Sequence, residues 1–407
     1  MNCRFCNAEL KTLFVSLGFS PLANSYLSKE QLSKAEPFYP LDVYVCDKCF
    51  LVQLFEFESP ENIFSDYAYF SSYSQTWLRH SQAYVDKMTS LFKINKKSLV
   101  IEIASNDGYL LQYFINKGIP VLGIEPARNV AKVALERGIP TQAVFFGTET
   151  AKRLAAQGKC ADLLLGNNVL AHVPNLNDFV QGLNILLKPE GIITMEFPHL
   201  LRLMESNQFD TIYQEHFSYF SFFTVENIFS AHNLTIFDVE ELSTHGGSLR
   251  IFVKHQGDNT KSISERVAKM LDKEISLGFS KISHYLIFDQ QVRKIKRDLL
   301  GFLIKAKQEE KIIVGYGAAA KGNTLLNYCG IRGDFIKYVA DRNPFKQGRY
   351  LPGSRIFIEH PEKIRETKPD YILILPWNIK DEVMEQLSFV RSWGGKFIIP
   401  IPELRVL

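Results

Sequence analysis

Residues 98–125 constrain the fold of this chain more than any other stretch. Residues 99–103 form a short apolar run typical of a buried parallel strand, residues 106–108 break it because they are turn-forming residues, and a helical pattern follows. The next apolar run, residues 121–124, ends in Glu125. In this order of elements the helix N-terminus attracts the polar or charged end of a ligand. An acidic side chain about twenty residues after the turn can hydrogen-bond the ribose hydroxyls of a nucleoside. We therefore expect a nucleoside site here.

The turn indicates which nucleoside this site binds. Glu102-x-Ala104-x-Asn106-x-Gly108 follows the E/D-x-G-x-G-x-G pattern of class I methyltransferases, with alanine and asparagine in place of the first two glycines. A dinucleotide fold normally carries G-x-G-x-x-G instead. The pattern favours S-adenosylmethionine (AdoMet) over NAD, and it leaves open a nucleotide fold that holds no ligand.

The strands that follow also favour a methyltransferase. Apolar runs at residues 161–165 and 191–197 predict further buried strands, and Asn167 lies at the carboxyl end of the first, where such sheets bind ligands. The runs at residues 234–239 and 248–254 are separated by a short turn, which predicts an antiparallel pair at the end of the sheet. An NAD-binding sheet would normally end in parallel strands.

Two Cys-x-x-Cys pairs lie near the N-terminus, Cys3 with Cys6 and Cys46 with Cys49. Four thiolates complete a tetrahedral zinc site that leaves no position for water. We therefore predict a structural zinc on which the fold of this small segment depends. A redox or disulfide pair is the alternative. An aromatic stretch at residues 67–73 either packs against the next domain or projects a tyrosine hydroxyl into the active site.

Charge and length narrow the class of protein. The chain carries 47 Lys and Arg against 44 Asp and Glu, a formal charge of +3, which does not support a nucleic-acid partner. No apolar stretch reaches transmembrane length, and the N-terminus lacks the layout of a signal peptide. We expect a cytoplasmic monomer that binds neither nucleic acid nor membrane. At 407 residues the chain is too long for one core, so we expect two or three domains.

Residues 211–220 combine proton-transfer groups with aromatic side chains that can exclude water. Tyr213, Glu215 and His216 are the polar members. Histidine has an unperturbed pKa near neutrality, and a neighbouring carboxylate would tune it, so His216 suits a general base. The clustering favours this role over that of an ordinary core histidine. His172 lies in the strand-to-helix loop where class I methyltransferases bring substrate and methyl donor together.

A second strand and glycine-rich turn begin at residue 311. The turn contains Gly315 and Gly317, Lys321 follows it, and the next apolar run ends in Asp341. Glycines let the backbone approach phosphates, and a lysine supplies a cation for them. This spacing predicts a nucleotide-binding unit, and a duplicated fold without a ligand is the alternative.

Motifs along the whole chain resemble one family, the AdoMet-dependent nucleotide-sugar C-methyltransferases that act on TDP-linked 4-keto-deoxyhexoses. Beside the cysteine pairs, the resemblance rests on SPLANSYL, SDYAYFSSYS, EIASNDGYLLQYF, GIEPA, NNVLAHVPN, TIYQEHFSYFS, HGGSLR and GYGAAAKGNT. It implies an α/β fold with a class I AdoMet-methyltransferase Rossmann-like core, a small N-terminal zinc-binding domain and a C-terminal Rossmann-like domain. We assign residues 1–80 to the zinc-binding cap, 81–257 to the core, 258–310 to a helical connector and 311–407 to the C-terminal domain.

The resemblance also implies roles for particular residues. His216 would be the base, assisted by Glu215, Tyr213, His172 and Tyr67. The AdoMet site would be lined by Glu102, Asn106, Gly108, Glu125 and Asn167, and the zinc ligands would be Cys3, Cys6, Cys46 and Cys49. The diphosphate of a nucleotide sugar would lie between the middle and C-terminal domains, near Lys321, Gly315 and Gly317. Some relatives carry histidine where Gln214 stands, so that position receives no chemical role.

The family implies methylation at C-3 of the sugar through an enolate. Methylation at C-5 of the same substrate class is an alternative that the sequence leaves open. An RNA methyltransferase with a zinc knuckle would need a basic stripe interleaved with aromatic residues, which the near-neutral charge does not support. A regulatory nucleotide-binding protein would not need Tyr213, Glu215 and His216.

Overall fold

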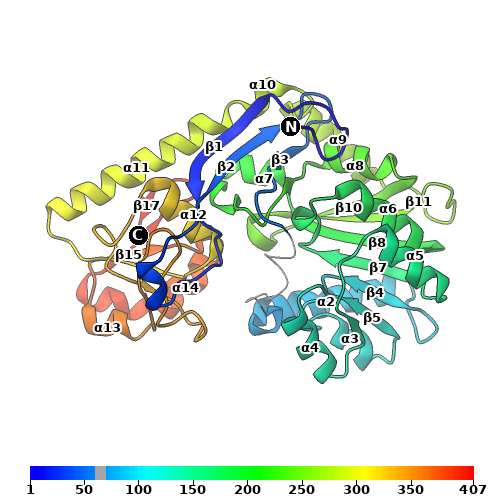
Figure 1. Cartoon of the computed structure of the whole chain (residues 1–407), viewed down its shortest axis with the longest axis horizontal. Coiled ribbons are helices and arrows are strands. Elements are labelled where there is room, and N and C mark those ends of the chain that lie inside the picture. The colour runs from blue at the N-terminus through cyan, green and yellow to red at the C-terminus, as the bar shows by residue number, and fades with distance from the viewer. Residues whose placement is uncertain (60–69) are drawn as a thin grey trace. The chain divides into compact units, whose positions relative to one another are not determined.

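The computed structural model describes residues 1–59 and 70–407 (Figure 1). These residues form two compact units. Unit 1 comprises Met1–Lys11, Cys46–His199 and Phe217–Ile282, and unit 2 comprises Thr12–Val45, Leu200–His216 and Ser283–Leu407. Each unit therefore combines three stretches that are separate in the sequence. The four consecutive segments expected from the sequence remain a prediction about domains.

Unit 1 contains a seven-stranded sheet in the order β10-β11-β8-β7-β4-β5-β6. Its strands are β4 (Val100–Ile103), β5 (Val121–Ile124), β6 (Thr141–Gln142), β7 (Ala161–Asn167), β8 (Leu187–Pro198), β10 (Leu234–Leu242) and β11 (Ser248–His255). β11 pairs antiparallel with both β8 and β10, whereas the β6–β5–β4–β7–β8 pairs are parallel. The predicted strands and the antiparallel closing pair are thereby confirmed.

Helices and short strands complete unit 1. The helices are α2 (Gln75–Leu91), α3 (Leu111–Asn116), α4 (Arg128–Glu136), α5 (Thr148–Ala156), α6 (Leu176–Leu186), α8 (Phe222–Ser230) and α9 (Glu265–Leu277), and β3 (Val52–Leu54) pairs with β9 (Ser218–Tyr219). The α2 helix begins where the Ser74 side chain accepts a hydrogen bond from the Trp77 amide, an N-cap that satisfies one free backbone donor.

The core of unit 1 packs α2 and α3 around the first strands of the sheet. Tyr84 and Met88 of α2 join Leu110 and Phe114 in one buried cluster with Val100 of β4. All four residues of β4 are buried, as expected of a central parallel strand with both faces covered. This packing fixes the carboxyl ends of β4 and β5, where the predicted nucleoside site begins.

Unit 2 contains a six-stranded sheet in the order β14-β13-β12-β15-β16-β17, parallel except for β17. The strands are β12 (Ile313–Tyr316), β13 (Val339–Ala340), β14 (Ile358–Glu359), β15 (Tyr371–Ile374), β16 (Lys396–Ile399) and β17 (Arg405–Val406), and the helices are α7 (Leu200–Glu205), α11 (Phe288–Gln308), α12 (Ala320–Cys329), α13 (Lys363–Thr367) and α14 (Lys380–Gln386). The strand order 3-2-1-4-5 of β14 to β16 is that of a Rossmann-like unit, as predicted.

The N-terminal part of unit 2 is an antiparallel hairpin of β1 (Thr12–Ser20) and β2 (Tyr39–Val45). A long loop joins the two strands and contains the SPLANSYL motif. The helical stretch predicted before β12 is confirmed as α9, α10 (Ile282–Tyr285) and α11. Within residues 1–59 and 70–407, no helix combines the length and the apolarity needed to cross a membrane.

Candidate active site and metal centre

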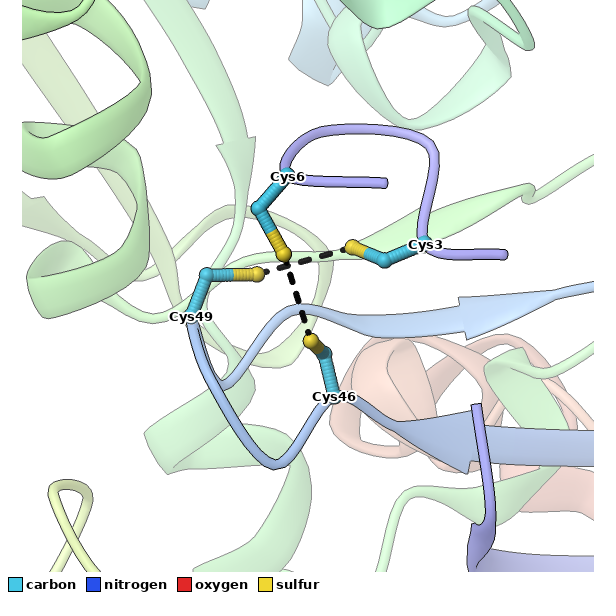
Figure 2. A group of neighbouring side chains, drawn as sticks. All are labelled: Cys3, Cys6, Cys46 and Cys49. Carbon is cyan, nitrogen blue, oxygen red and sulfur yellow. Dashed lines mark hydrogen bonds between the residues drawn. The ribbon is translucent and has the colours of Figure 1, made fainter. Parts of the chain in front are cut away.

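The four predicted zinc ligands converge in unit 1. Figure 2 shows the sulfur atoms of Cys3, Cys6, Cys46 and Cys49 pointing toward one another, and all lie within 4.8 Å of each other. The Sγ atoms are 3.5 Å apart in the pairs Cys3–Cys49 and Cys6–Cys46. Tetrahedral zinc with Zn–S bonds of about 2.3 Å needs sulfurs roughly 3.8 Å apart. The four thiolates therefore fit zinc and leave no ligand position open.

Both halves of this centre use the same backbone turn. The amide of Asn7 donates to the Cys3 carbonyl at 3.0 Å, and the amide of Phe50 donates to the Cys46 carbonyl at the same distance. Asn7 and Phe50 both have left-handed backbone angles, with φ of 60° and 61°. The buried Gln53 amide adds a hydrogen bond to Cys3 Sγ at 3.1 Å, which favours the thiolate. The duplicated turn presents two sulfurs from each pair to one ion.

The turn after β4 keeps the backbone of a glycine-rich motif at all three glycine positions. Ala104, Asn106 and Gly108 have φ of 54°, 49° and 78°. Asparagine tolerates this region better than most residues, and its side chain here also accepts a hydrogen bond from the Ser71 amide at 2.8 Å. The degenerate sequence therefore adopts the same left-handed turn that glycines would give.

Glu125 closes this turn from the end of β5. Its carboxylate accepts hydrogen bonds from the Asn106 and Ala127 amides, each at 2.9 Å. The side chain is 5% exposed, and burial raises the pKa of the Glu125 carboxyl, with the two amides acting in the opposite direction. Each carboxylate oxygen keeps a second lone pair for a ribose hydroxyl.

Buried hydrogen-bond acceptors surround the turn, and they test whether the site fits AdoMet. Ser105 Oγ, Asp107 Oδ1 and Asn167 Oδ1 have no hydrogen-bond partner among the described residues, although all three side chains are less than a tenth exposed. Glu102 of β4 is fully buried beside them, and burial raises the pKa of its carboxyl well above the ordinary value. AdoMet carries an ammonium group, hydroxyls and an adenine amine, which are the donors these acceptors lack.

Aromatic and imidazole rings that the sequence motifs did not predict as site residues line the same edge of the sheet. Trp77 stacks on His80 and Tyr109, with ring centroids 5.0 and 6.0 Å apart, and meets His245 edge-on at 5.2 Å. His245 Nε2 accepts from the Asn168 amide group at 3.1 Å. Spacing could not reveal this group because its members come from α2, the β4 turn and the HGGSLR turn.

The predicted base belongs to unit 2. His216 Nδ1 lies 2.8 Å from the carbonyl oxygen of Thr211, which can only accept, so Nδ1 carries the proton in the neutral ring. His216 Nε2 then accepts from the Tyr213 hydroxyl at 2.9 Å. The two rings are 4.1 Å apart. This arrangement leaves the proton-accepting nitrogen next to a phenolic hydroxyl.

Glu215 is buried on the same loop, with 3% of its surface exposed. Its carboxylate accepts a hydrogen bond of 2.7 Å from the side-chain amide of Asn24, a residue of the loop between β1 and β2. The next hydrogen bond along this loop joins the Gln214 amide to the Ser20 carbonyl at 3.1 Å. Gln214 therefore has a structural contact here.

The second glycine-rich turn repeats the acid arrangement of the first. Asp341 accepts from the Ala318 amide at 2.6 Å and from the Asn343 amide at 2.7 Å, as Glu125 does from its own pair of amides. Gly317 has φ of 89°, and a Cβ there would lie 2.5 Å from Pro376 Cδ. A Cβ at Gly315 would lie 2.8 Å from Val339 Cγ2. Packing alone therefore accounts for both glycines.

Lys321 lies in the first turn of α12 and is half-buried. Its Nζ donates to Asn378 Oδ1 at 3.2 Å and lies 4.8 Å from the centre of the Trp377 ring. Burial lowers the pKa of the Lys321 ammonium, and the charge of Asp210 opposes this. Asp210 is fully buried and accepts from Trp377 Nε1 at 2.7 Å, and burial raises the pKa of its carboxyl to about 6.

Tyr67 and His172 are the two remaining residues predicted to assist the base. Tyr67 lies outside the described residues. His172 ends the short helix η3 (Leu170–His172) of unit 1, in the loop after β7, and is half-buried. The roles assigned to individual site residues stay predictions.

Known families match nearly all of the chain. Residues 3–64 match the family described as "Putative zinc binding domain", residues 77–239 "Methyltransferase domain" and residues 243–402 "C-methyltransferase C-terminal domain". The C-methyltransferase NovU of Streptomyces niveus is 35% identical over 405 residues, which cover 100% of this chain and 96% of that protein. The chain belongs to this C-methyltransferase family. The family expected from the motifs is thereby confirmed.

Two partial likenesses accompany this full-length one. A ubiquinone biosynthesis O-methyltransferase of Bartonella tribocorum is 26% identical over 95 residues, 23% of this chain and 38% of that protein. The magnesium protoporphyrin IX methyltransferase of Synechocystis PCC 6803, solved with bound SAM, is 13% identical over 43% of this chain and 78% of that one, with a TM-score of 0.34.

The family and the strand order together confirm the predicted fold class and cofactors. The core is a class I AdoMet-methyltransferase fold, joined to a zinc-binding segment with its four-cysteine centre. The protein is therefore an AdoMet-dependent C-methyltransferase.

Proposed function

We propose that this C-methyltransferase acts on a 4-keto-deoxyhexose linked to a nucleotide diphosphate and methylates C-3, with His216 as general base. The observation that carries the proposal is the hydrogen bonding of the imidazole. The Thr211 carbonyl holds the proton on Nδ1, so Nε2 presents a lone pair. Carbon methylation requires a base in a way that methylation of an amine does not, because a sugar carbon has no lone pair of its own.

The chemistry follows from the acidity of a carbon next to a ketone. His216 Nε2 takes the proton from C-3, and the electron pair of the broken C–H bond moves onto the ketone as an enolate. When bound, AdoMet would supply the methyl group: the enolate carbon would form the new C–C bond as the methyl–sulfur bond breaks, and the electron pair of that bond would stay on sulfur in S-adenosylhomocysteine. The proton on the resulting imidazolium then leaves to solvent, which returns His216 to its starting state.

Tyr213 would assist this step. Its hydroxyl donates to His216 Nε2 at 2.9 Å. When the sugar C–H approaches Nε2, the hydroxyl can turn to the 4-keto oxygen, where negative charge develops in the transition state. A donor aimed at developing charge in a dry site stabilises the transition state more than the ground state. His172 and Tyr67 are further candidates for this donor role.

The C-terminal Rossmann-like sheet supports a nucleotide-linked substrate. Lys321 provides a cation beside the second glycine-rich turn, and Asp341 stands where a Rossmann acid binds ribose. A diphosphate bound near Lys321 would fix the position of the nucleotide, and the covalent bond between them would then limit the distance of the sugar from it. Methylation at C-5 would use the same base and the same enolate chemistry, so it remains the second candidate.

The test combines product analysis with His216 variants. Incubation with AdoMet and a panel of nucleotide 4-keto-deoxyhexoses, followed by mass spectrometry and NMR of the product, identifies the sugar and the methylated carbon. We expect His216→Ala to lower kcat about a hundred- to ten-thousand-fold, because general-base catalysis contributes about that much. The variant should also lose solvent deuterium exchange at the attacked carbon while its AdoMet affinity is retained.

His360→Ala is the matched control, because His360 is exposed at the surface of unit 2. It should keep both turnover and exchange. Near-normal turnover of His216→Ala would contradict the assignment of the base. A product methylated at C-5 would leave the base assignment intact and correct the position.

A further inference from the structure

The SPLANSYL loop, residues 20–27, contacts the loop that carries the proposed base. Asn24 Nδ2 donates to Glu215 Oε1 at 2.7 Å, although the two residues are 191 positions apart in the chain. A second contact joins the Gln214 amide to the Ser20 carbonyl at 3.1 Å. Gln214 and Glu215, the two residues before His216, are therefore both held by the SPLANSYL segment, which runs from the end of β1 into the β1–β2 loop.

We propose that Asn24 is a positioning residue of the active site, which keeps the carboxylate of Glu215, the residue before His216, ionised and fixed in orientation. The inference rests on the proposed function for its catalytic consequence. A carboxylate that is 3% exposed needs hydrogen-bond donors to replace water. An amide Nδ2 can only donate, so the contact favours the charged acceptor over the neutral acid.

The same loop is anchored a second time at the glycine-rich turn. The Tyr26 hydroxyl donates to the Ala318 carbonyl at 2.6 Å, and Lys346 Nζ donates to the same carbonyl at 2.8 Å. The backbone of Leu27 also pairs with Tyr350. With anchors on both sides, the loop can hold the Asn24 amide in place without relying on the Glu215 contact.

Tyr26 is a titratable group that interacts electrostatically with Glu215. Burial raises the pKa of the Tyr26 hydroxyl. The charge of Lys346 lowers this pKa, and the charges of Asp341 and Glu215 raise it. His216 and Tyr213 lie on the base loop itself. Asn24 donates directly to Glu215 Oε1, so its replacement should act on this carboxylate.

An ionised Glu215 has a specific use in the proposed reaction. When His216 takes a proton, the ring becomes an imidazolium, and a nearby negative charge favours that form. In the proposed reaction the carboxylate of Glu215, the residue before His216, supplies this charge. A neutral Glu215 would withdraw this stabilisation. Asn24 would then act on the reaction through Glu215 without touching the substrate.

The test replaces the donor with a second carboxyl group. In Asn24→Asp two carboxyls face each other at hydrogen-bond distance, and like charges this close share one proton, which raises one pKa by more than one unit. NMR titration of protein labelled at the glutamate carboxyl carbon, with Glu215→Gln to assign the signal, measures this directly. The acid limb of the pH profile of kcat/KM should move to higher pH by the same amount.

Asn24→Ala removes the donor without adding charge, and it should also raise the Glu215 pKa. Ser25→Asp is the matched control, because it places a carboxyl at the neighbouring exposed position and should leave both readouts unchanged. An unchanged Glu215 titration in both Asn24 variants would overturn the inference. Lack of wild-type turnover on every nucleotide sugar would instead refute the proposed function, since the NMR titration needs no substrate.

Discussion

Replacement of Gly108 by alanine should destabilise unit 1 and weaken AdoMet binding together. Gly108 has φ of 78°, and a Cβ there would lie 2.1 Å from Ile139 Cδ1. The left-handed backbone costs a non-glycine residue about 1–2 kcal/mol. Displacement of the buried Ile139 side chain adds about 1–3 kcal/mol of overpacking. Together these give about 2–5 kcal/mol, and each kcal/mol lowers Tm by about 2–4 °C for a unit of 150–250 residues.

Two further variants separate the two contributions. Gly158 has φ of 73°, and no described atom lies within 4 Å of its Cβ position, so Gly158→Ala measures the backbone strain alone. Ile139→Val removes the Cδ1 atom that the new Cβ would meet. The Gly108→Ala/Ile139→Val double variant should therefore be less destabilised than the two single effects predict, with a coupling of about 1–3 kcal/mol.

Scanning calorimetry with and without AdoMet, and titration calorimetry for affinity, provide the measurements. We expect Gly108→Ala to lose at least about tenfold in AdoMet affinity, which corresponds to about 1.4 kcal/mol, because the turn that Glu125 closes must shift. Gly158→Ala should keep wild-type affinity. If Gly108→Ala and Gly158→Ala have the same Tm and the same AdoMet affinity, the packing of Ile139 does not constrain the turn, and the reasoning fails.

Three other predictions follow from the metal centre and unit 2. Chelation of zinc should lower Tm reversibly. Elemental analysis should find zinc lost in Cys49→Ser but retained in Cys160→Ser, since Cys160 lies outside the four-sulfur centre. A zinc-free protein with unchanged Tm would refute the structural role of the metal. Lys321→Ala should raise the KM for the nucleotide sugar about tenfold or more while the AdoMet Kd stays constant. Lys337→Ala is the control, because Lys337 is exposed. A nicotinamide cofactor retained through purification would contradict the assignment of this turn to the nucleotide sugar. Burial raises the pKa of Asp210 from 3.8 to about 6, so the folded state holds its proton more tightly and stability should fall by about 3 kcal/mol as pH rises from about 4 to 6. Asp210→Asn keeps an acceptor for Trp377 and should remove this part of the pH dependence, and an unchanged thermal profile against pH would show that another group is responsible.

Much of the fold could be predicted because its signals are local. Buried parallel strands appear as short apolar runs, and the runs at residues 121–124 and 161–165 became β5 and β7. The two Cys-x-x-Cys pairs predicted one metal centre, because a tetrahedral ion requires four ligands and each pair supplies two. The acid at the end of β5 could be found from its spacing after the turn, and the contact of Glu125 with the Asn106 amide agrees with that position.

The tertiary structure decided what spacing cannot encode. Asn24 and Glu215 are joined across 191 positions, and the Trp77 cluster is assembled from three separate elements. The sequence by itself determined which segments become strands, which residues can bind metal and where the nucleoside turn lies, because these depend on neighbours a few residues apart. The packing of distant segments decides which acid accepts from which donor. It also decides how the chain divides into two interleaved units, and a local pattern carries no information about that packing.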